Sequence, residues 1–279
     1  MNNSTPLLKA LFLEGRVPYR YKASFNKFKD KRIPAINLKY QTYILSNKIK
    51  DIFGIRRKRN FKLASVIVLT YNNIKFTKIT LNSIIKSTKF PYELIIVDNG
   101  SDKETLDWLE HFKKVNSKYT NIKIIKRNPK DNWTREKKIY SAKNVAIKEA
   151  KGDLIAVSDN DVKFRPYWLF YATDIMNIFP KAGLVGLQIP GYHGYNRIIK
   201  KNRHKIYEMD TIEGCLLVFS KKTYDLVGPF KEGPQKYPGQ TYTGCDYEYT
   251  KRIVKFGLFN AVPVGDLIEH MQQPRGKYK

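Results

Sequence analysis

Two aspartates, Asp159 and Asp161, stand one residue apart directly after the apolar run 154–157. A run of this length, opened by the turn signal Gly152-Asp153, predicts a short buried strand. Ligands of open α/β sheets lie beyond the carboxyl ends of the strands. Two carboxylates there suit a hard divalent cation that takes its other ligands from water and substrate phosphates. An ordinary acidic loop is the competing interpretation, because Asp-x-Asp alone is a common sequence.

Polar residues also follow two earlier apolar runs of the chain. The first run ends at Thr70, Tyr71 and Asn72, and the second ends at Asp98. In a parallel sheet these ends and the Asp159 segment all fall on one edge. We therefore expect one site to be assembled from several strand ends, which is harder to obtain by chance than any single motif.

The elements that would position this edge alternate between strands and helices. Four near-continuous apolar runs predict strands, and the stretches between them have helical spacing, which together predict a parallel sheet with helices on both faces. Ser101 and Glu104 predict a capping box at one helix start. The strands are expected at 64–69, 94–97, 122–125 and 154–157, and the third helix at 135–150. Beyond Pro166 we expect strands at 184–189 and 213–220, and a mobile loop at 190–205.

The charge is strongly positive, with 52 Lys and Arg against 25 Asp and Glu, a formal net charge of +27. Residues 1–62 form a basic extension that holds 16 of the basic and 3 of the acidic residues. Such a field favours a polyanionic partner, either nucleic acid, an anionic membrane or a phosphate-rich glycan. A biased composition with ordinary solvated faces is the alternative. The extension has helical apolar spacing over 38–53, and its aromatics could bind nucleic acid, lie on a membrane or pack on the main domain.

Several classes of protein are disfavoured by what the sequence lacks. No apolar run approaches 18 residues, and no signal peptide is recognisable at the N-terminus. Two cysteines, Cys215 and Cys245, do not make a disulfide framework, which favours a reducing, cytoplasmic location. There is no G-x-G-x-x-G and no Walker A sequence, so neither a dinucleotide oxidoreductase nor a P-loop enzyme is favoured.

Taken in order, these motifs resemble family 2 glycosyltransferases, which are inverting enzymes of the GT-A fold. The resemblance rests on five ordered segments: 66–72, 93–101, 143–144, 152–155 and 158–161. It covers residues 63 to about 270 and leaves 1–62 outside. It implies a nucleotide-sugar-binding half at 63–165 and an acceptor-binding half at 166–279.

The resemblance also implies roles for residues of the donor site. Thr70, Tyr71 and Asn72 would line the nucleotide pocket, and Asp98 would accept hydrogen bonds from the base, usually uracil. Lys143 and Asn144 stand where the family often has Arg-Asn, so Lys143 could neutralise phosphate without a bidentate fork.

In the Asp-x-Asp motif, Asp161 would contact Mn²⁺ or Mg²⁺, and Asp159 would contact the metal or the donor. His270 follows the strand-like segment 261–264 and would complete the metal site, although a lone histidine is more often structural.

For the acceptor, the resemblance implies a catalytic base at the helix that begins near residue 245. Asp246 matches that base and Glu248 is a second candidate, while Cys245 replaces the usual Glu. An inverting transfer needs a base to take the proton as the acceptor oxygen attacks. Asp246 could instead only cap its helix. Glu213 could contact sugar or acceptor, or serve as a structural partner.

Three functions therefore remain open at this level. The first is a metal-dependent glycosyltransferase that moves a sugar from a nucleoside diphosphate, with uridine favoured by Asp98, to a cell-envelope glycan. Its basic extension would then hold it peripherally at the membrane. The second is the same chemistry on a hydroxymethylated base in DNA, as in some phage enzymes. The third is a catalytically dead nucleic-acid-binding relative, which the intact Asp98, Asp159, Asp161 and Asp246 argue against.

Overall fold

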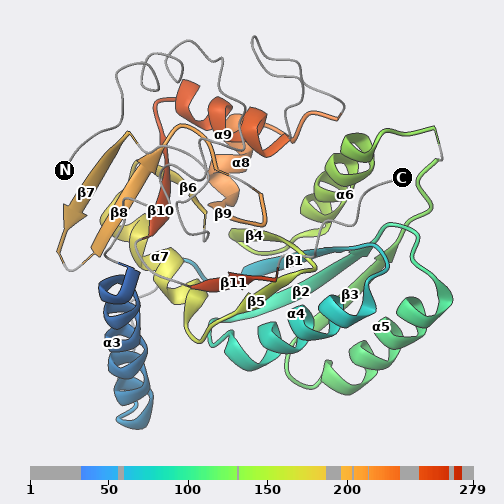
Figure 1. Ribbon diagram of the computed structural model, residues 1–279, viewed down its shortest axis with the longest axis horizontal. Coiled ribbons are helices and arrows are strands. Elements are labelled where there is room, and N and C mark those ends of the chain that lie inside the picture. Colours follow the sequence, from blue (N-terminus) through green and yellow to red (C-terminus); the bar gives the residue numbers. More distant parts are fainter. Residues whose placement is uncertain are drawn as a thin grey trace, which may run out of the picture.

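The computed structural model describes residues 33–55, 60–130, 132–186, 196–202, 204–212, 214–232, 245–263 and 267–271. Figure 1 shows one large sheet with helices packed on both sides and one long helix, α3, standing at the side of the molecule. Among the described residues, no helix is both long and apolar enough to cross a membrane.

The elements follow one another in an order that begins with alternating strands and helices. The helices are α3 (Ile33–Ile52), α4 (Ile74–Ser87), α5 (Lys103–Asn116), α6 (Arg135–Glu149), α7 (Trp168–Ile178), α8 (Lys221–Val227) and α9 (Cys245–Lys255). The strands are β1 (Ala64–Thr70), β2 (Tyr92–Asp98), β3 (Asn121–Lys126), β4 (Leu154–Asp159), β5 (Val162–Phe164), β6 (Ala182–Gly186), β7 (Arg197–Lys201), β8 (His204–Met209), β9 (Leu216–Ser220), β10 (Phe259–Pro263) and β11 (Ile268–His270).

The main sheet has nine strands in the order β3-β2-β1-β4-β9-β6-β10-β8-β7. Its first four strands are parallel neighbours, and β6 and β10 run in the same direction as these four. Strands β9 and β8 are reversed, because each pairs antiparallel with both of its neighbours. The mostly parallel sheet predicted from the sequence is therefore confirmed, and one sheet takes its strands from both sides of residue 165.

Two hydrophobic cores lie on opposite faces of this sheet, as strand periodicity requires. In β1, Val66 and Val68 face one core and Ile67 and Leu69 face the other, and all four are buried. Helices α4, α5 and α7 contribute to the first core, and α6, α8 and α9 contribute to the second. Because β1 is buried on both faces, its sequence reads as a continuous apolar run rather than an alternating one.

Helix α3 packs on the main domain through aromatic side chains on one of its faces. The hydroxyl of Tyr43 donates to Asp174 Oδ2 at 2.7 Å, and that of Tyr40 donates to the carbonyl of Pro166 at 2.5 Å. From the domain, the hydroxyl of Tyr167 donates to Asp51 Oδ2 at 2.5 Å. In this part of the basic extension, the aromatics therefore pack on the main domain, which is one of the three alternatives that the sequence left open.

Two local expectations from the sequence are wrong. The predicted loop at 190–205 contains, in its described part, strand β7 and the start of β8, which form an antiparallel hairpin. The predicted capping box is absent, because the cap of α5 is Asp102, whose carboxylate accepts from the Thr105 amide at 2.8 Å. Ser101 instead hydrogen-bonds to Asp98.

The two strands expected beyond Pro166 are present with shifted bounds. The strand predicted at 184–189 is described only as far as Gly186, and the one predicted at 213–220 begins at Leu216. Glu213 lies outside the described residues.

Candidate functional site

The carboxyl ends of β1, β2 and β4 meet at one edge of the sheet, as the sequence predicted. Thr70 is the register partner of Asp98, and Leu69 is the partner of Asp159. The polar residues that follow these strands are therefore neighbours in space.

Asp98 is buried and organises the turn after β2. Its Oδ1 accepts from the hydroxyls of Ser101 and Thr70, the latter at 3.2 Å. Its Oδ2 accepts from the amides of Gly100 at 3.1 Å and Ser101 at 3.0 Å. The carboxylate thus already accepts four hydrogen bonds from the chain, about the number of lone pairs that it offers. A nucleotide base would have to replace one of these donors, and the Thr70 hydroxyl is the most distant.

Asn72 and Tyr71 follow β1 with different exposures. Asn72 has a left-handed backbone with φ of 50°, its amide donates to the Ser101 hydroxyl at 2.7 Å, and its side-chain oxygen accepts from the Asp102 amide at 2.8 Å. These bonds fix the turn to the start of α5. The Tyr71 side chain is 62% exposed beside this turn and is therefore accessible to a ligand.

Asp161 and His270 come together although they are distant in sequence. Strand β11 pairs with β5, which places His270 opposite Val162, directly after Asp161. His270 Nε2 lies 3.3 Å from Asp161 Oδ2. The other carboxylate oxygen, Oδ1, is buried and has no hydrogen-bond partner among the described residues. A buried carboxylate oxygen without a donor is costly unless something positive reaches it, so this pair fits a divalent cation.

Asp159 lies at the centre of the charged groups on this edge. Burial raises the pKa of its carboxyl to about 6, the positive charge of Lys143 opposes that rise, and the negative charges of Asp246 and Asp161 add to it. His270 also lowers this pKa. No three His, Cys, Asp or Glu side chains of the described residues form a ready-made metal cluster. A metal here would therefore need ligands from its substrate as well as from the chain.

Lys143 and Asp246 form a direct ion pair across the site. Lys143 Nζ lies 2.5 Å from Asp246 Oδ1, and the lysine side chain is only 1% exposed. The Asp246 carboxylate also lies against Gly214, where an added Cβ would come within 1.9 Å of Oδ2. The position of the carboxylate is thus set on two sides, by a buried cation and by a residue without a side chain.

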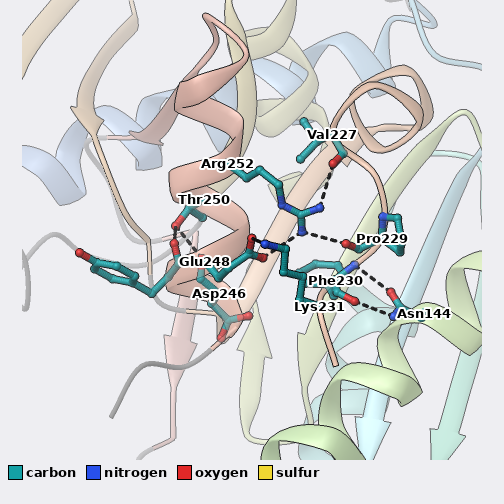
Figure 2. A network of polar contacts seen from close by, with 10 residues as sticks. Asn144, Val227, Pro229, Phe230, Lys231, Asp246, Glu248, Thr250 and Arg252 are labelled. Atoms are coloured by element: carbon teal, nitrogen blue, oxygen red, sulfur yellow. Dashed lines mark hydrogen bonds and ion pairs between the residues drawn. The ribbon is translucent and has the colours of Figure 1, made fainter. Parts of the chain in front are cut away.

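The side chain of Asn144, the neighbour of Lys143, is hydrogen-bonded to the backbone of Phe230. Its side-chain amide donates to the Phe230 carbonyl at 2.8 Å, and its oxygen accepts from the Phe230 amide at 3.0 Å. Figure 2 shows this two-bond clamp between α6 and the segment after α8. Asn144 therefore has a positioning role, and the clamp fixes the turn of α6 that carries Lys143.

Glu248 is buried in a second set of contacts on the same segment (Figure 2). Its carboxylate pairs with Arg252 at 2.9 Å and with Lys231 at 3.3 Å. Arg252 also donates to the carbonyls of Val227 at 2.9 Å and Pro229 at 2.8 Å. With two cations on one buried carboxylate, Glu248 holds α9 to the segment after α8.

Sequence reasoning missed the residues that hold this site together, above all Gly214 and Arg252. An isolated glycine beside a strand can mark a close approach of another group, so Gly214 offered a weak signal. Arg252 offered none, because a basic residue in the last turns of a helix is ordinary.

The chain is similar to several known proteins. The model of the family described as "Glycosyl transferase family 2" matches residues 65–238. Chondroitin synthase of Escherichia coli is 24% identical over 159 residues, which is 56% of this chain and 22% of that protein. The chain spans about a quarter of the length of the first curated relatives that it matches.

Two solved structures share the fold. GalNAc-T7, solved with UDP, GalNAc and Mn²⁺, superposes with a TM-score of 0.62 at 17% identity, covering 78% of this chain and 45% of that one. The mannosyltransferase PcManGT of Pyrobaculum calidifontis, solved with GDP-Man and Mn²⁺, gives 0.60 at 15% identity, covering 88% and 69%. These similarities confirm the expected GT-A fold. Because the family model covers more than half of the sequence, this chain belongs to glycosyl transferase family 2.

Proposed function

We propose that this chain is an inverting glycosyltransferase that moves a sugar from a nucleoside diphosphate to a hydroxyl group of an anionic glycan. One observation carries the proposal: four charged side chains from separate segments form two pairs at this edge of the sheet, with Lys143 Nζ 2.5 Å from Asp246 Oδ1 and His270 Nε2 3.3 Å from Asp161 Oδ2. They are Lys143 of α6, Asp161 after β4, Asp246 of α9 and His270 of β11. Such a convergence of both signs at strand ends is typical of a site that handles a charged substrate.

In the proposed site, Asp161 and His270 would hold Mn²⁺ or Mg²⁺, with Asp159 contacting the metal, a water or the donor ribose. Both solved relatives contain Mn²⁺, which supports a divalent metal. When bound, the cation supplies electrostatic stabilisation of the charge that develops on the departing diphosphate.

The chain's own residues would carry out the proton transfer and the orientation. Asp246 would take the proton of the acceptor hydroxyl as its oxygen forms a bond to the sugar's anomeric carbon. The bond from that carbon to the diphosphate breaks, and its electron pair leaves with the phosphate oxygen. Lys143 would orient the Asp246 carboxylate before the acceptor arrives, since its ammonium is buried against that carboxylate.

For the donor, we propose a uridine nucleotide that binds beside the turn organised by Asp98, with Tyr71 stacking or packing on the nucleotide. The base would replace the Thr70 hydroxyl at Asp98, the longest of its four hydrogen bonds. The acceptor is proposed to be an anionic cell-envelope glycan, because the net charge of +27 attracts polyanions.

The test is donor turnover with a panel of UDP-, GDP- and dTDP-sugars and Mn²⁺, measured as release of nucleoside diphosphate. Asp161→Ala should abolish turnover, whereas Asp246→Asn should abolish transfer but keep donor binding. Asp107→Asn, at an exposed ion pair on α5, is the matched control and should behave as the parent chain does.

Two results would overturn parts of the proposal. Full turnover by Asp161→Ala would remove the metal assignment. Transfer of sugar to hydroxymethylated DNA, with none to anionic glycans, would replace the glycan acceptor with DNA.

A further inference from the structure

The outer face of α3 carries an apolar stripe that the described residues leave uncovered. Leu45, Ile49 and Ile52 are 59%, 44% and 77% exposed. Their spacing of four and three residues places them on one side of the helix. Phe53 and Ile55, which follow the helix, are also exposed. We refer to these five side chains as the α3 stripe.

The opposite face of α3 fixes the orientation of this stripe. Tyr40 and Asn47 are buried, and the contacts of Tyr43 and Asp51 with α7 and the preceding turn hold that face against the domain. Isolated exposed aliphatic residues are common, whereas five grouped at one end of a docked helix are not. Figure 1 shows α3 at the side of the molecule, beside α7 and projecting beyond it.

The charge around the stripe identifies its partner. Two basic residues of α3 flank the stripe: Lys48 stands four residues before Ile52, and Lys50 stands three residues before Phe53. A helix with an apolar face and basic flanks lies in the interface of an anionic bilayer, where the apolar side chains enter the acyl boundary and the cations meet lipid phosphates. We infer that the α3 stripe docks this chain on an anionic lipid surface.

Nucleic acid fits the same stripe less well. Binding to a polynucleotide needs cations that track phosphates and flat rings on which bases stack. Four of the five stripe residues are aliphatic, and Phe53 alone has a ring. The aliphatic side chains therefore favour a lipid partner over nucleic acid. The positive charge beside them favours an anionic lipid over a neutral one. This inference concerns where the chain works and does not depend on the reaction proposed above.

The experiment is co-sedimentation of the whole chain with vesicles of phosphatidylcholine alone or with 30% phosphatidylglycerol. The parent chain should bind the anionic vesicles and lose that binding as salt rises. Ile49→Glu/Ile52→Glu should bind at least about tenfold more weakly, since two apolar anchors are lost.

The matched control is Gln41→Glu/Ser46→Glu, which adds the same two charges at exposed positions of α3 without removing an apolar group. It should bind more weakly than the parent chain because of the added charge, but at least about threefold more tightly than Ile49→Glu/Ile52→Glu, because it keeps both apolar groups. Ile49→Ser/Ile52→Ser should also bind weakly, which separates lost apolar contact from added charge. Thermal unfolding should be unchanged in all three variants, because the substituted positions are exposed.

The inference is overturned if Ile49→Glu/Ile52→Glu binds anionic vesicles as the control does. It is also overturned if the parent chain binds no vesicles, or if it dimerises through the stripe. Light scattering tests the last case, in which the parent chain would be a dimer and the double glutamate variant a monomer.

Discussion

Replacing Gly214 with alanine tests whether the position of the Asp246 carboxylate controls catalysis. The new Cβ would lie 1.9 Å from Oδ2 and 2.0 Å from Cγ of Asp246, whereas ordinary contacts begin at 3.4 Å. The carboxylate would therefore have to move by about 1.5 Å. A displacement of about 1 Å can cost ~100-fold in rate, and a general base contributes ~100- to 10,000-fold. We expect kcat to fall by about 100-fold.

Stability should also fall, because moving the carboxylate disturbs its ion pair with the buried ammonium of Lys143. The assay is steady-state turnover together with thermal unfolding of Gly214→Ala, Asp246→Asn and the double variant. If both act on one base, the double variant should be no slower than Asp246→Asn alone. Gly257→Ala is the control for turnover: nothing lies within 4 Å of that Cβ, so it should keep the parent kcat, although its φ of +75° should lower the unfolding temperature.

Two results would refute this reasoning. Turnover of Gly214→Ala within about threefold of the parent chain would show that the carboxylate position is not critical. A fully additive loss in the double variant would show that Gly214 acts on something other than Asp246.

Three further predictions concern the groups around the site. Lys143→Met removes the cation that lowers the pKa of Asp159, so this pKa should rise above 6. The acid limb of the turnover–pH profile should then move to higher pH, and a limb that stays in place would contradict this prediction. Asn144→Ala removes both hydrogen bonds to buried Phe230 and should destabilise the fold by about 2–3 kcal/mol in urea unfolding, with a loss under 0.5 kcal/mol arguing against the clamp. Burial lowers the pKa of His204 below its ordinary value near 6.5, so the His204 contribution to stability should fall as the pH drops from 7 to 5, opposite in sign to that of Asp159, whose pKa is raised to about 6. His204→Phe should therefore gain stability relative to the parent chain as the pH drops over this range.

The central strands could be predicted from the sequence because burial on both faces leaves near-continuous apolar runs. For β1, β2 and β4, the runs and the polar residues at their ends were sufficient to place the site on one sheet edge. The β7–β8 hairpin could not be predicted in this way. Its outer strand, β7, forms the edge of the sheet and carries charges such as that of Lys200, as edge strands often do, so the segment resembles a solvated loop.

The contacts that complete the site depend on tertiary pairing that local patterns do not encode. Strands β5 and β11 have three residues each, too short for a periodic signal, yet their pairing brings His270 to Asp161. Ser101 illustrates the same limit at short range. Its hydroxyl is taken by buried Asp98, so the helix start moves to Asp102.

The place of β9 between β4 and β6 also bears on how the chain emerges during synthesis. Until β9 is available, β4 has no partner on that side, and its apolar edge from Leu154 to Val157 remains open. The 57 residues that separate Ser158 from its contact on Cys215 take about 3 to 11 s to translate at ~5–20 residues per second. During that interval the nascent chain presents an unpaired, β-branched edge, which makes it a substrate for chaperones and a point at which truncated products aggregate.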